Sequence, residues 1–454
     1  MPSGLQVGHA VPMPFANLLP ARDSVANPAP GRDRAIDVAR LSALVTVMFG
    51  HCALLLATVN ENGLRIGNIL GELPQLSPIT WVVQVMPLFF FAGGAAGAYG
   101  WHPDGSAAGK AWGSWLVSRT QRLCRPVFWY LAFWTVALLV ARLTLGAESA
   151  DRLGRECVAL LWFLGVYLVV IAFVPALTRL HSPGAFGAVI ASLVVAAALI
   201  DQVRFAVGSA EAGVLNFVIV WLIPVVIGVG YARRLIRPRM ALLTAAVALT
   251  TQVLLVVYGP YEVALVTNGS SEGVSNVSPP TVLLAVHCIW MVGVFVAIAG
   301  IVERLAERPR VWYVVAVGNG GAMTLYLWHI PAIAVAAFSL NAFGLDAWDV
   351  HAPDFWALLA LRAAVFAVVM LATFLLLSPL EHRRLPWWDA AVGATGVRST
   401  VAGVLVCLAG VAMLLVAKNG LAGADGWVPL ACFLVAVLAA RACAGVRGSV
   451  SEVR

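Results

Sequence analysis

Two side chains able to do chemistry lie in one apolar run near the N-terminus, RDRAIDVARLSALVTVMFGHCALLL: Arg40 and His51. Ionisable residues inside apolar runs are costly to bury, so each is a candidate functional residue. On a helix, His51 lies about 16 Å beyond Arg40. Asp37, three residues before Arg40, is spaced to orient its guanidinium. An alternative is that His51 is a packed histidine, hydrogen-bonded to a neighbouring helix.

The chemistry of this pair favours a long ligand that is anionic at one end and reactive at the other. An arginine at the mouth of a helix binds phosphate, and an imidazole deeper in the same helix accepts a proton. Coenzyme A has this shape. A second arginine group, in SRTQRLCRPVFWYLAFW, adds Arg119, Arg122 and Arg125. Arg122 and Arg125 share one helix face, which predicts either a phosphate-binding patch or a plain membrane anchor.

Four further polar or aromatic residues lie inside apolar runs. His329 and Tyr326 belong to MTLYLWHIPA, and the depth of His329 is comparable with that of His51. We expect His329 either to line the same cavity or to form a structural hydrogen bond. Trp162, in LWFLGVYLVVIAFVP, is interpreted first as a packing residue and second as a support for the site. Arg362 needs a partner, which the sequence does not identify.

The composition indicates the elements that hold these residues. Of 454 residues, 61% are hydrophobic and 11% are charged, and the mean hydropathy is +0.90. These values exclude a soluble enzyme, a disordered chain and a disulfide-rich secreted module. The seven cysteines form no CxxC pair and no Cys/His cluster, so we expect no metal site. No alternation of basic and aromatic residues indicates a nucleic-acid partner.

The apolar runs are long enough to cross a bilayer as helices, so the predicted fold is an all-α, polytopic transmembrane bundle. Ten core spans are expected, and two more follow them. The predicted core spans are 37–59, 78–100, 124–145, 157–177, 185–203, 214–232, 239–258, 280–301, 317–340 and 355–380. The predicted organisation is a flexible cytoplasmic tail at 1–35, a ten-span domain at 36–385, a basic Trp-containing link at 386–399, two additional helices at 400–445 and a cytoplasmic tail at 446–454.

The loop charges predict the orientation. Most of the 29 Lys and Arg residues fall in alternate loops if the N-terminus is inside, and the other loops hold few. Cytoplasmic loops carry such an excess. We therefore expect an integral protein of a bacterial plasma membrane, with both termini in the cytoplasm.

Taken together, these fragments resemble membrane-bound acyltransferase family 3, the integral-membrane O-acyltransferases. Arg40 and His51, preceded by IDVARLSAL, match its first motif, and PLFFFAGGAAGAYG looks like its aromatic and glycine segment. Arg122-Leu-Cys-Arg125 matches the paired arginine motif. LWFLGVYL with Pro175 and then TLYLWHIP follow in the right order. The resemblance covers residues 32–385, and two features depart from it: there is no fused esterase-like domain, and two extra spans follow.

The resemblance implies an acyl-CoA-dependent enzyme. Members transfer an acyl group, often acetyl, from cytoplasmic acyl-CoA to a hydroxyl of a surface polysaccharide, a glycolipid or a glycosylated small molecule. Carried over, His51 is the catalytic base, or forms an acyl-histidine, and Arg40, Arg122 and Arg125 bind the coenzyme. Acyl-CoA (acetyl-CoA) is then a co-substrate, and no cofactor is permanently bound.

The alternative is a transporter or flippase of a lipid-linked glycan, because intramembrane His and Arg also occur in proton-coupled carriers. Such a protein is expected to contain internal repeats and discontinuous helices. No repeat is visible in the sequence.

Overall fold

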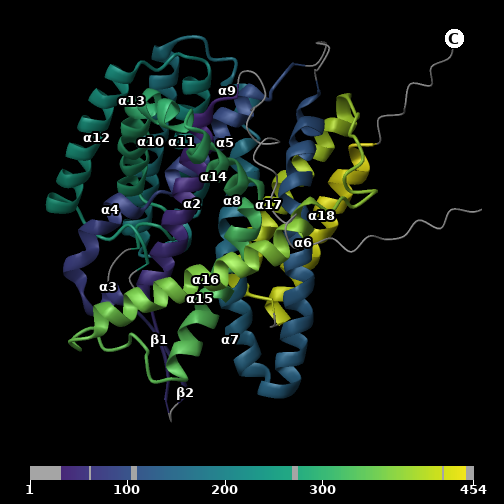
Figure 1. The fold of residues 1–454 in the computed structure, drawn as a ribbon. Coiled ribbons are helices and arrows are strands. Elements are labelled where there is room, and N and C mark those ends of the chain that lie inside the picture. The colour runs from purple at the N-terminus through teal and green to yellow at the C-terminus, as the bar shows by residue number, and fades with distance from the viewer. Residues whose placement is uncertain (1–31, 61–62, 104–109, 268–274, 422–423, 446–454) are drawn as a thin grey trace, which may run out of the picture.

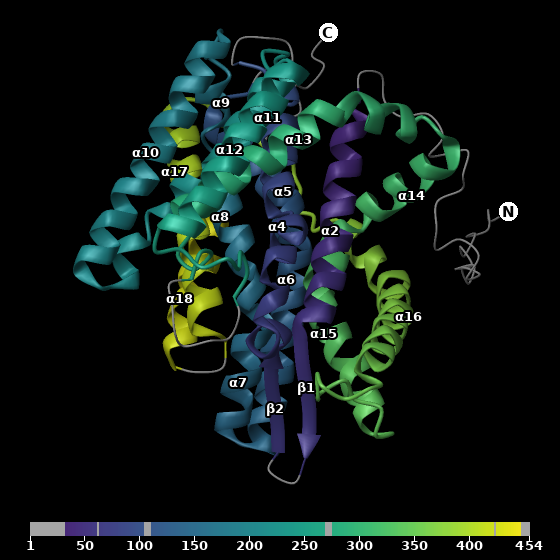
Figure 2. The same ribbon diagram turned by 90° about the vertical axis from the view of Figure 1, so that its left-hand side faces the viewer.

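The computed structural model describes residues 32–60, 63–103, 110–267, 275–421 and 424–445. Within these ranges, twelve helical segments are long and apolar enough to span a membrane, which confirms the all-α bundle of ten spans and two more. A two-stranded hairpin protrudes at one end (Figures 1 and 2). We call this the hairpin end, and the opposite end the Arg40 end. Residues 1–31 of the predicted N-terminal tail and the predicted tail at 446–454 lie outside the described residues.

Helix α2 (Arg34–Leu54) carries the first motif and is capped at its start by two carboxylates. The side chain of Asp33 and that of Glu303, from α13 (Val282–Ala306), each accept a hydrogen bond from a first-turn amide. The helix ends at Leu54, and the chain continues into β1 (Leu55–Asn60), which pairs antiparallel with β2 (Gly63–Asn68). The predicted helix over 37–59 is therefore wrong at its end. Gly63 begins β2 opposite Asn60, and the glycine next to an asparagine in the sequence is a turn signal that the apolar run concealed.

The second span is broken. A 3₁₀ segment η2 (Pro74–Ile79) and α4 (Thr80–Val83) lead to α5 (Met86–Tyr99). Helix α5 packs closely on α11 (Asn216–Ala232), because a Cβ on Gly94 would lie 2.4 Å from the Val225 carbonyl oxygen and one on Gly228 would lie 2.2 Å from that of Phe91. Small residues let membrane helices approach this closely, which explains the glycines of the AGGAAGAYG segment.

Helix α6 (Trp112–Leu145) begins twelve residues earlier than predicted, so Arg119, Arg122 and Arg125 all lie within the helix. It is followed by α7 (Ala147–Val158), η3 (Ala159–Leu161), α8 (Trp162–Ile171) and α9 (Val174–Leu177). Three long helices come next: α10 (Pro183–Val207), α12 (Pro238–Tyr258) and α13 (Val282–Ala306), with α11 between the first two.

A buried carboxylate fixes the long loop before α13. Asp201 on α10 accepts hydrogen bonds from Asn216 (3.0 Å), from the Tyr261 hydroxyl (3.0 Å) and from the Val282 amide (2.8 Å). Burial, reinforced by the Asp201 carboxylate, raises the pKa of Tyr261, so its hydroxyl stays protonated and donates. These bonds tie the loop to α10 and cap the start of α13.

The predicted span 317–340 is two helices, α14 (Pro309–Gly320) and α15 (Ala322–Asn341), which separate at two adjacent glycines. Helix α16 (Phe355–His382) crosses the bundle obliquely beside α15 (Figure 1). The glycines and the capping bonds at α15 explain the break, since glycine lowers helix stability.

The last two helices, α17 (Gly396–Asn419) and α18 (Ala424–Cys443), pack against the rest of the bundle. Helix α17 contacts α8 at a pair of glycines: a Cβ on Gly165 would lie 2.6 Å from the Gly410 carbonyl oxygen, and one on Gly410 would lie 2.7 Å from that of Gly165. Arg441 of α18, 1% exposed, donates to the carbonyls of Trp387, Trp388 and Ala390. These hydrogen bonds attach the link before α17 to α18.

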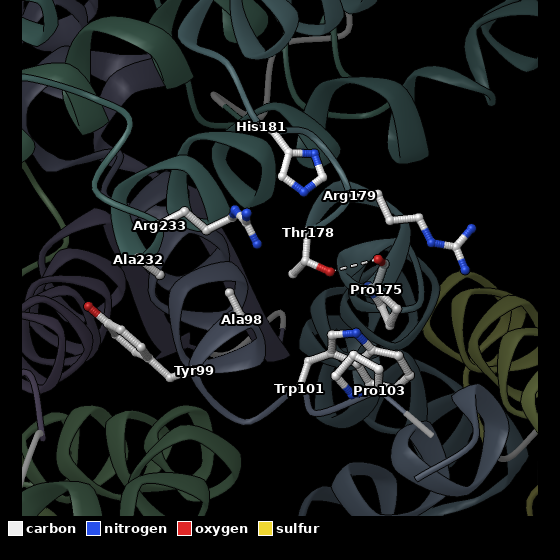
Figure 3. Close-up of a pocket in the computed structure, with 10 residues that line it drawn as sticks. All are labelled: Ala98, Tyr99, Trp101, Pro103, Pro175, Thr178, Arg179, His181, Ala232 and Arg233. Carbon is white, nitrogen blue, oxygen red and sulfur yellow. Dashed lines mark hydrogen bonds between the residues drawn. The ribbon is translucent and has the colours of Figure 1, made fainter. Parts of the chain in front are cut away.

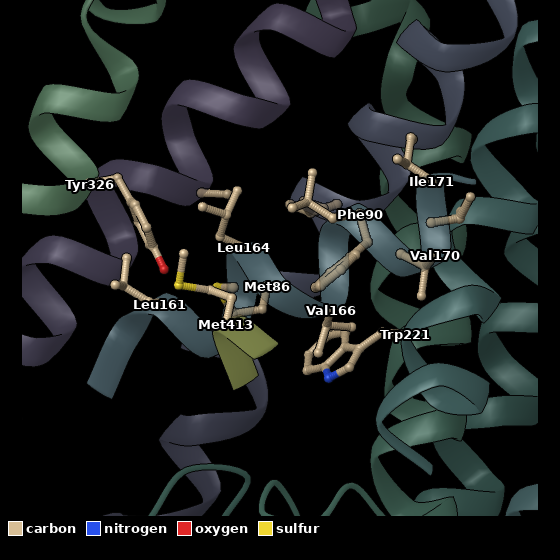
Figure 4. Packing of buried hydrophobic residues seen from close by; sticks show 14 of the residues in the cluster. Met86, Phe90, Leu161, Leu164, Val166, Val170, Ile171, Trp221, Tyr326 and Met413 are labelled. Carbon is tan, nitrogen blue, oxygen red and sulfur yellow. The ribbon is translucent and has the colours of Figure 1, made fainter. Parts of the chain in front are cut away.

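A continuous apolar core joins these helices. Figure 4 shows Met86 and Phe90 of α5 with Leu164 and Val166 of α8, and Trp221 of α11 beside them. Phe90 stacks on Trp221 with ring centroids 4.7 Å apart. The core holds α5, α8 and α11 in fixed positions next to α15, which carries His329.

Candidate active site

The two histidines singled out by the sequence meet. Nδ1 of His51 on α2 lies 3.0 Å from Nε2 of His329 on α15, and the two rings are nearly parallel. On its other side, Nδ1 of His329 lies 2.6 Å from the backbone carbonyl oxygen of Tyr326, one turn earlier in α15. His329 is completely buried, whereas His51 is half-buried. The pair therefore has one fully buried and one half-buried member.

These contacts determine where the protons are on the two rings. The Tyr326 carbonyl only accepts, so Nδ1 of His329 carries the hydrogen and Nε2 of the neutral ring is an acceptor. His51 must then donate through its own Nδ1. Its Nε2 is left with a free lone pair and makes no hydrogen bond to the described residues. The carbonyl and His329 thus fix His51 in the tautomer that a general base requires.

Two contacts position the pair. The Tyr326 hydroxyl donates to the Leu160 carbonyl, which ties α15 to η3. Nη2 of Arg362, a residue 2% exposed on α16, donates to the Cys52 carbonyl at 2.8 Å. The partner that Arg362 needs is therefore the carboxyl end of α2, next to His51, where a cation interacts favourably with the helix dipole.

Trp162 lies further from the histidines. Its ring packs on Phe163 and Trp221, and Phe163 in turn packs on Tyr326 with centroids 5.5 Å apart. Trp162 is thus separated from His329 by two aromatic rings. Its contacts are those of a packing residue, and its support of the site stays a prediction.

The start of α15 is anchored by a carboxylate. Glu381, near the end of α16, accepts hydrogen bonds from both the amide and the hydroxyl of Thr324, each at 2.9 Å. Thr324 precedes His329 by little more than one turn. Glu381 therefore fixes the helix that presents His329.

The arginines form a cluster nearer the other end of α2. Arg119 on α6 lies close enough to Arg40 and Arg122 for electrostatic repulsion, and Tyr167 of α8 is also near it. Arg119 donates to the Ala96 carbonyl at 3.0 Å. By contrast, Arg40 and Arg122 make no hydrogen bond or ion pair to the described residues. Guanidinium groups without partners are able to bind a multiply charged anion, so the prediction that Arg40 and Arg122 bind a coenzyme stays a prediction.

Asp37 does not orient Arg40 as expected. Its carboxylate accepts from Nε of Arg32 at 2.6 Å, and its backbone carbonyl accepts from Asn319. Asp37 therefore fixes the start of α2 against α14. The reason is that a carboxylate in the first helical turn faces back to the preceding loop, where Arg32 lies.

Arg125 is engaged within the protein. Its Nη2 and Nε bind Asp389 of the link at 2.5 and 3.2 Å, and its Nη1 donates to the Glu381 carbonyl. All three nitrogens thus have protein partners, so these contacts join α6 to α16 and the link. That Arg125 also binds a coenzyme stays a prediction.

The break in the second span has a structural partner. His287 of α13, fully buried, bonds through Nε2 to the backbone carbonyl of Gln84 at 2.8 Å. A helix break frees backbone groups that need partners in an apolar bundle. His287 provides one, so this break does not indicate a transport site.

A model of the acyltransferase domain family, membrane-bound family 3, matches residues 33–378. The chain belongs to this acyltransferase family. No curated protein and no solved structure matches it significantly. The matched range of this acyltransferase holds both histidines, the arginine cluster and Arg362, but not Glu381, Asp389, α17 or α18.

The sequence pointed to most of the site of this acyltransferase but missed its connections. The direct contact between His51 and His329, and the roles of Glu381 and Asp389 as anchors, depend on how α2, α15 and α16 cross. A signal was present for Asp389, an acidic residue in the basic stretch EHRRLPWWDA after a span.

Proposed function

We propose that the protein transfers an acyl group, and specifically acetyl, from cytoplasmic acyl-CoA to a hydroxyl of a sugar-containing acceptor. The acceptor class is a surface polysaccharide, a glycolipid or a glycosylated small molecule. The observation that carries the proposal is Nε2 of His51, which makes no hydrogen bond to the described residues and whose tautomer is fixed by His329, within a chain of the acyltransferase family.

In the proposed reaction, Nε2 of His51 removes the proton of the acceptor hydroxyl. The oxygen attacks the thioester carbonyl carbon, an ester C–O bond forms and the C–S bond breaks. The leaving thiolate takes the proton from His51, which returns the base to its starting state. General-base assistance of this kind contributes about 10²–10⁴-fold to the rate. An acyl-histidine intermediate is the variant in which Nε2 attacks the thioester itself.

The arginine cluster supports the same direction of approach. Arg40 and Arg122 lie toward the end of the bundle opposite the hairpin, which we assign to the cytoplasm. Both guanidinium groups are free to hold the phosphates of the coenzyme. The distance of about 16 Å along α2 from Arg40 to His51 suits a pantetheine arm. Arg125, bound to Asp389, would position α6 rather than contact the phosphates directly.

The test is the transfer of label from [¹⁴C]acetyl-CoA to glycan or glycolipid fractions in membranes that contain the full chain. His51→Ala should lose transfer while the protein remains inserted. His351→Ala is a matched control, because His351 is exposed at the hairpin end. Transfer at the wild-type rate by His51→Ala would refute the catalytic role. A wild-type chain that moves lipid-linked glycan between leaflets without consuming acetyl-CoA would favour a flippase instead.

The arginines are tested separately. Arg122→Ala should raise the KM for the acyl donor without changing the thermal stability. Arg125→Ala should instead lower the stability, because its carboxylate partner would be left unpaired. An unchanged KM in Arg122→Ala would favour the membrane-anchor interpretation.

A further inference from the structure

A recess of about 380 Å³ opens at the Arg40 end, where α5, α9 and α11 finish. Its lining includes Trp101, Arg179, His181 and Arg233, which come from the segments that follow these helices (Figure 3). In this view Arg233 and His181 extend toward each other over one side of the recess, Trp101 lies below them and Arg179 is on the opposite rim. In the sequence these arginines count only among the loop charges that predict the orientation.

The chemistry of the lining is that of a site for an aromatic anion. It contains two guanidinium groups, one imidazole and an indole, and none of the described residues that line it carries a carboxylate. The side chains of Arg179 and Arg233 make no hydrogen bond or ion pair to the described residues. Arginine binds phosphate with several donors, and an indole face stacks on a nucleobase with sequence-independent affinity.

The recess is joined to the arginine cluster by two tryptophans. Trp101 packs edge-on against Trp115, with centroids 5.5 Å apart, and the Arg119 guanidinium lies over the Trp115 ring at 4.8 Å. The recess and the cluster at Arg40 and Arg122 are therefore two anion-binding groups separated by one aromatic wall.

Helix α2 gives the spacing between these groups and the histidine pair. The Tyr99 hydroxyl, at the recess, bonds to Asp33 at 3.2 Å, so the recess is level with the start of α2. Arg40 lies about 10 Å further along α2 and His51 about 27 Å along it. A ligand with a base and phosphate at one end, further phosphates in the middle and a reactive group at the other fits this order.

We propose that the recess binds the adenine and the ribose phosphate of the acyl donor, while the arginine cluster binds its diphosphate. This inference rests on the proposed function. It assigns Arg233 and His181 to the phosphate on the ribose and Trp101 to the base. Arg233 and Trp101 are therefore substrate-binding residues that the family motifs do not include.

The experiment measures binding of coenzyme A and of dephospho-coenzyme A, which lacks the ribose phosphate, to the full chain in detergent by titration calorimetry. The wild type should bind coenzyme A about tenfold more tightly. Arg233→Gln should lower the affinity for coenzyme A to that for dephospho-coenzyme A. The affinity for dephospho-coenzyme A itself should stay unchanged. Trp101→Leu should weaken both ligands by about the same factor. Arg239→Gln is the control, since Arg239 is exposed at the same end outside the recess.

Four results would overturn the proposal. If Arg233→Gln lowered the affinities for coenzyme A and dephospho-coenzyme A equally, Arg233 would not recognise the ribose phosphate. Unchanged coenzyme affinity in Arg233→Gln, with weaker binding to nanodiscs rich in phosphatidylglycerol, would assign the recess to a lipid phosphate instead. If the wild type bound neither coenzyme, both this inference and the acyl-CoA donor of the proposed function would be overturned. If the wild type bound coenzyme A tightly and no variant changed that affinity, only this inference would be overturned.

Discussion

Replacing His329 by leucine tests whether this buried residue acts through His51. The substitution keeps the side-chain volume similar but removes the acceptor for Nδ1 of His51. A neutral hydrogen bond is worth about 1 kcal/mol and one to a charged group about 1.5–3 kcal/mol. The bond therefore gains about 0.5–2 kcal/mol as His51 takes the proton, which is a factor of about 2–30 in rate.

A second effect adds to this factor. Without the acceptor, His51 divides between its two tautomers, and only one leaves Nε2 free. Together the two effects predict a fall in kcat of about 4–60-fold, with the KM for the acyl donor unchanged because no donor contact is lost. His329→Gln, whose amide oxygen still accepts a hydrogen bond, should recover part of the rate.

The assay is initial-rate acetyl transfer in membranes by wild type, His329→Leu, His329→Gln, His51→Ala and the double variant. If His329 acts only through His51, the double variant is no slower than His51→Ala. Wild-type kcat in His329→Leu would refute the tautomer argument. Losses that multiply in the double variant would show instead that His329 contacts the substrate independently.

Three predictions concern the positioning contacts and are checked by thermal unfolding in detergent. Gly165→Leu should lower the unfolding temperature strongly, because the side chain would enter the backbone of α17, whereas Gly300→Leu, with open space around it, should not. Asp389→Ala should lower it by leaving a half-buried guanidinium of α6 unpaired, and Glu148→Gln, at an exposed ion pair, should have almost no effect. Asp201→Ala should cost about 3 kcal/mol, because it removes the acceptor of three buried hydrogen bonds; an unchanged unfolding temperature would contradict its role as the anchor of the loop before α13.

The number of spans was predictable because apolar length is a local property of the sequence. The same signal failed where two elements share one apolar run: it merged β1 with α2 and joined α14 to α15. In both places glycine or asparagine determines the outcome, and hydropathy is insensitive to either residue. The predicted boundaries of the membrane domain, the link and the C-terminal helices stay predictions.

The individual site residues were predictable for a similar reason, since a histidine in an apolar run is conspicuous by its type alone. Their pairing was not, because it depends on how α2 crosses α15. Arg125 shows the limit most clearly: in sequence it is equivalent to Arg122, yet one is paired with Asp389 and the other is free. Only the packing of the link distinguishes them.

The glycine contact between α8 and α17 also bears on how the protein is made. Helix α17 follows the whole matched domain in the chain, yet it packs against α8, and Asp389 of the link before it holds Arg125. During synthesis the earlier spans enter the membrane first, at about 5–20 residues per second, and for some seconds that face of α8 lacks its partner. A nascent chain that stops at the end of the matched domain is therefore expected to be inserted without the contacts that α17 and the link supply to α8 and α6.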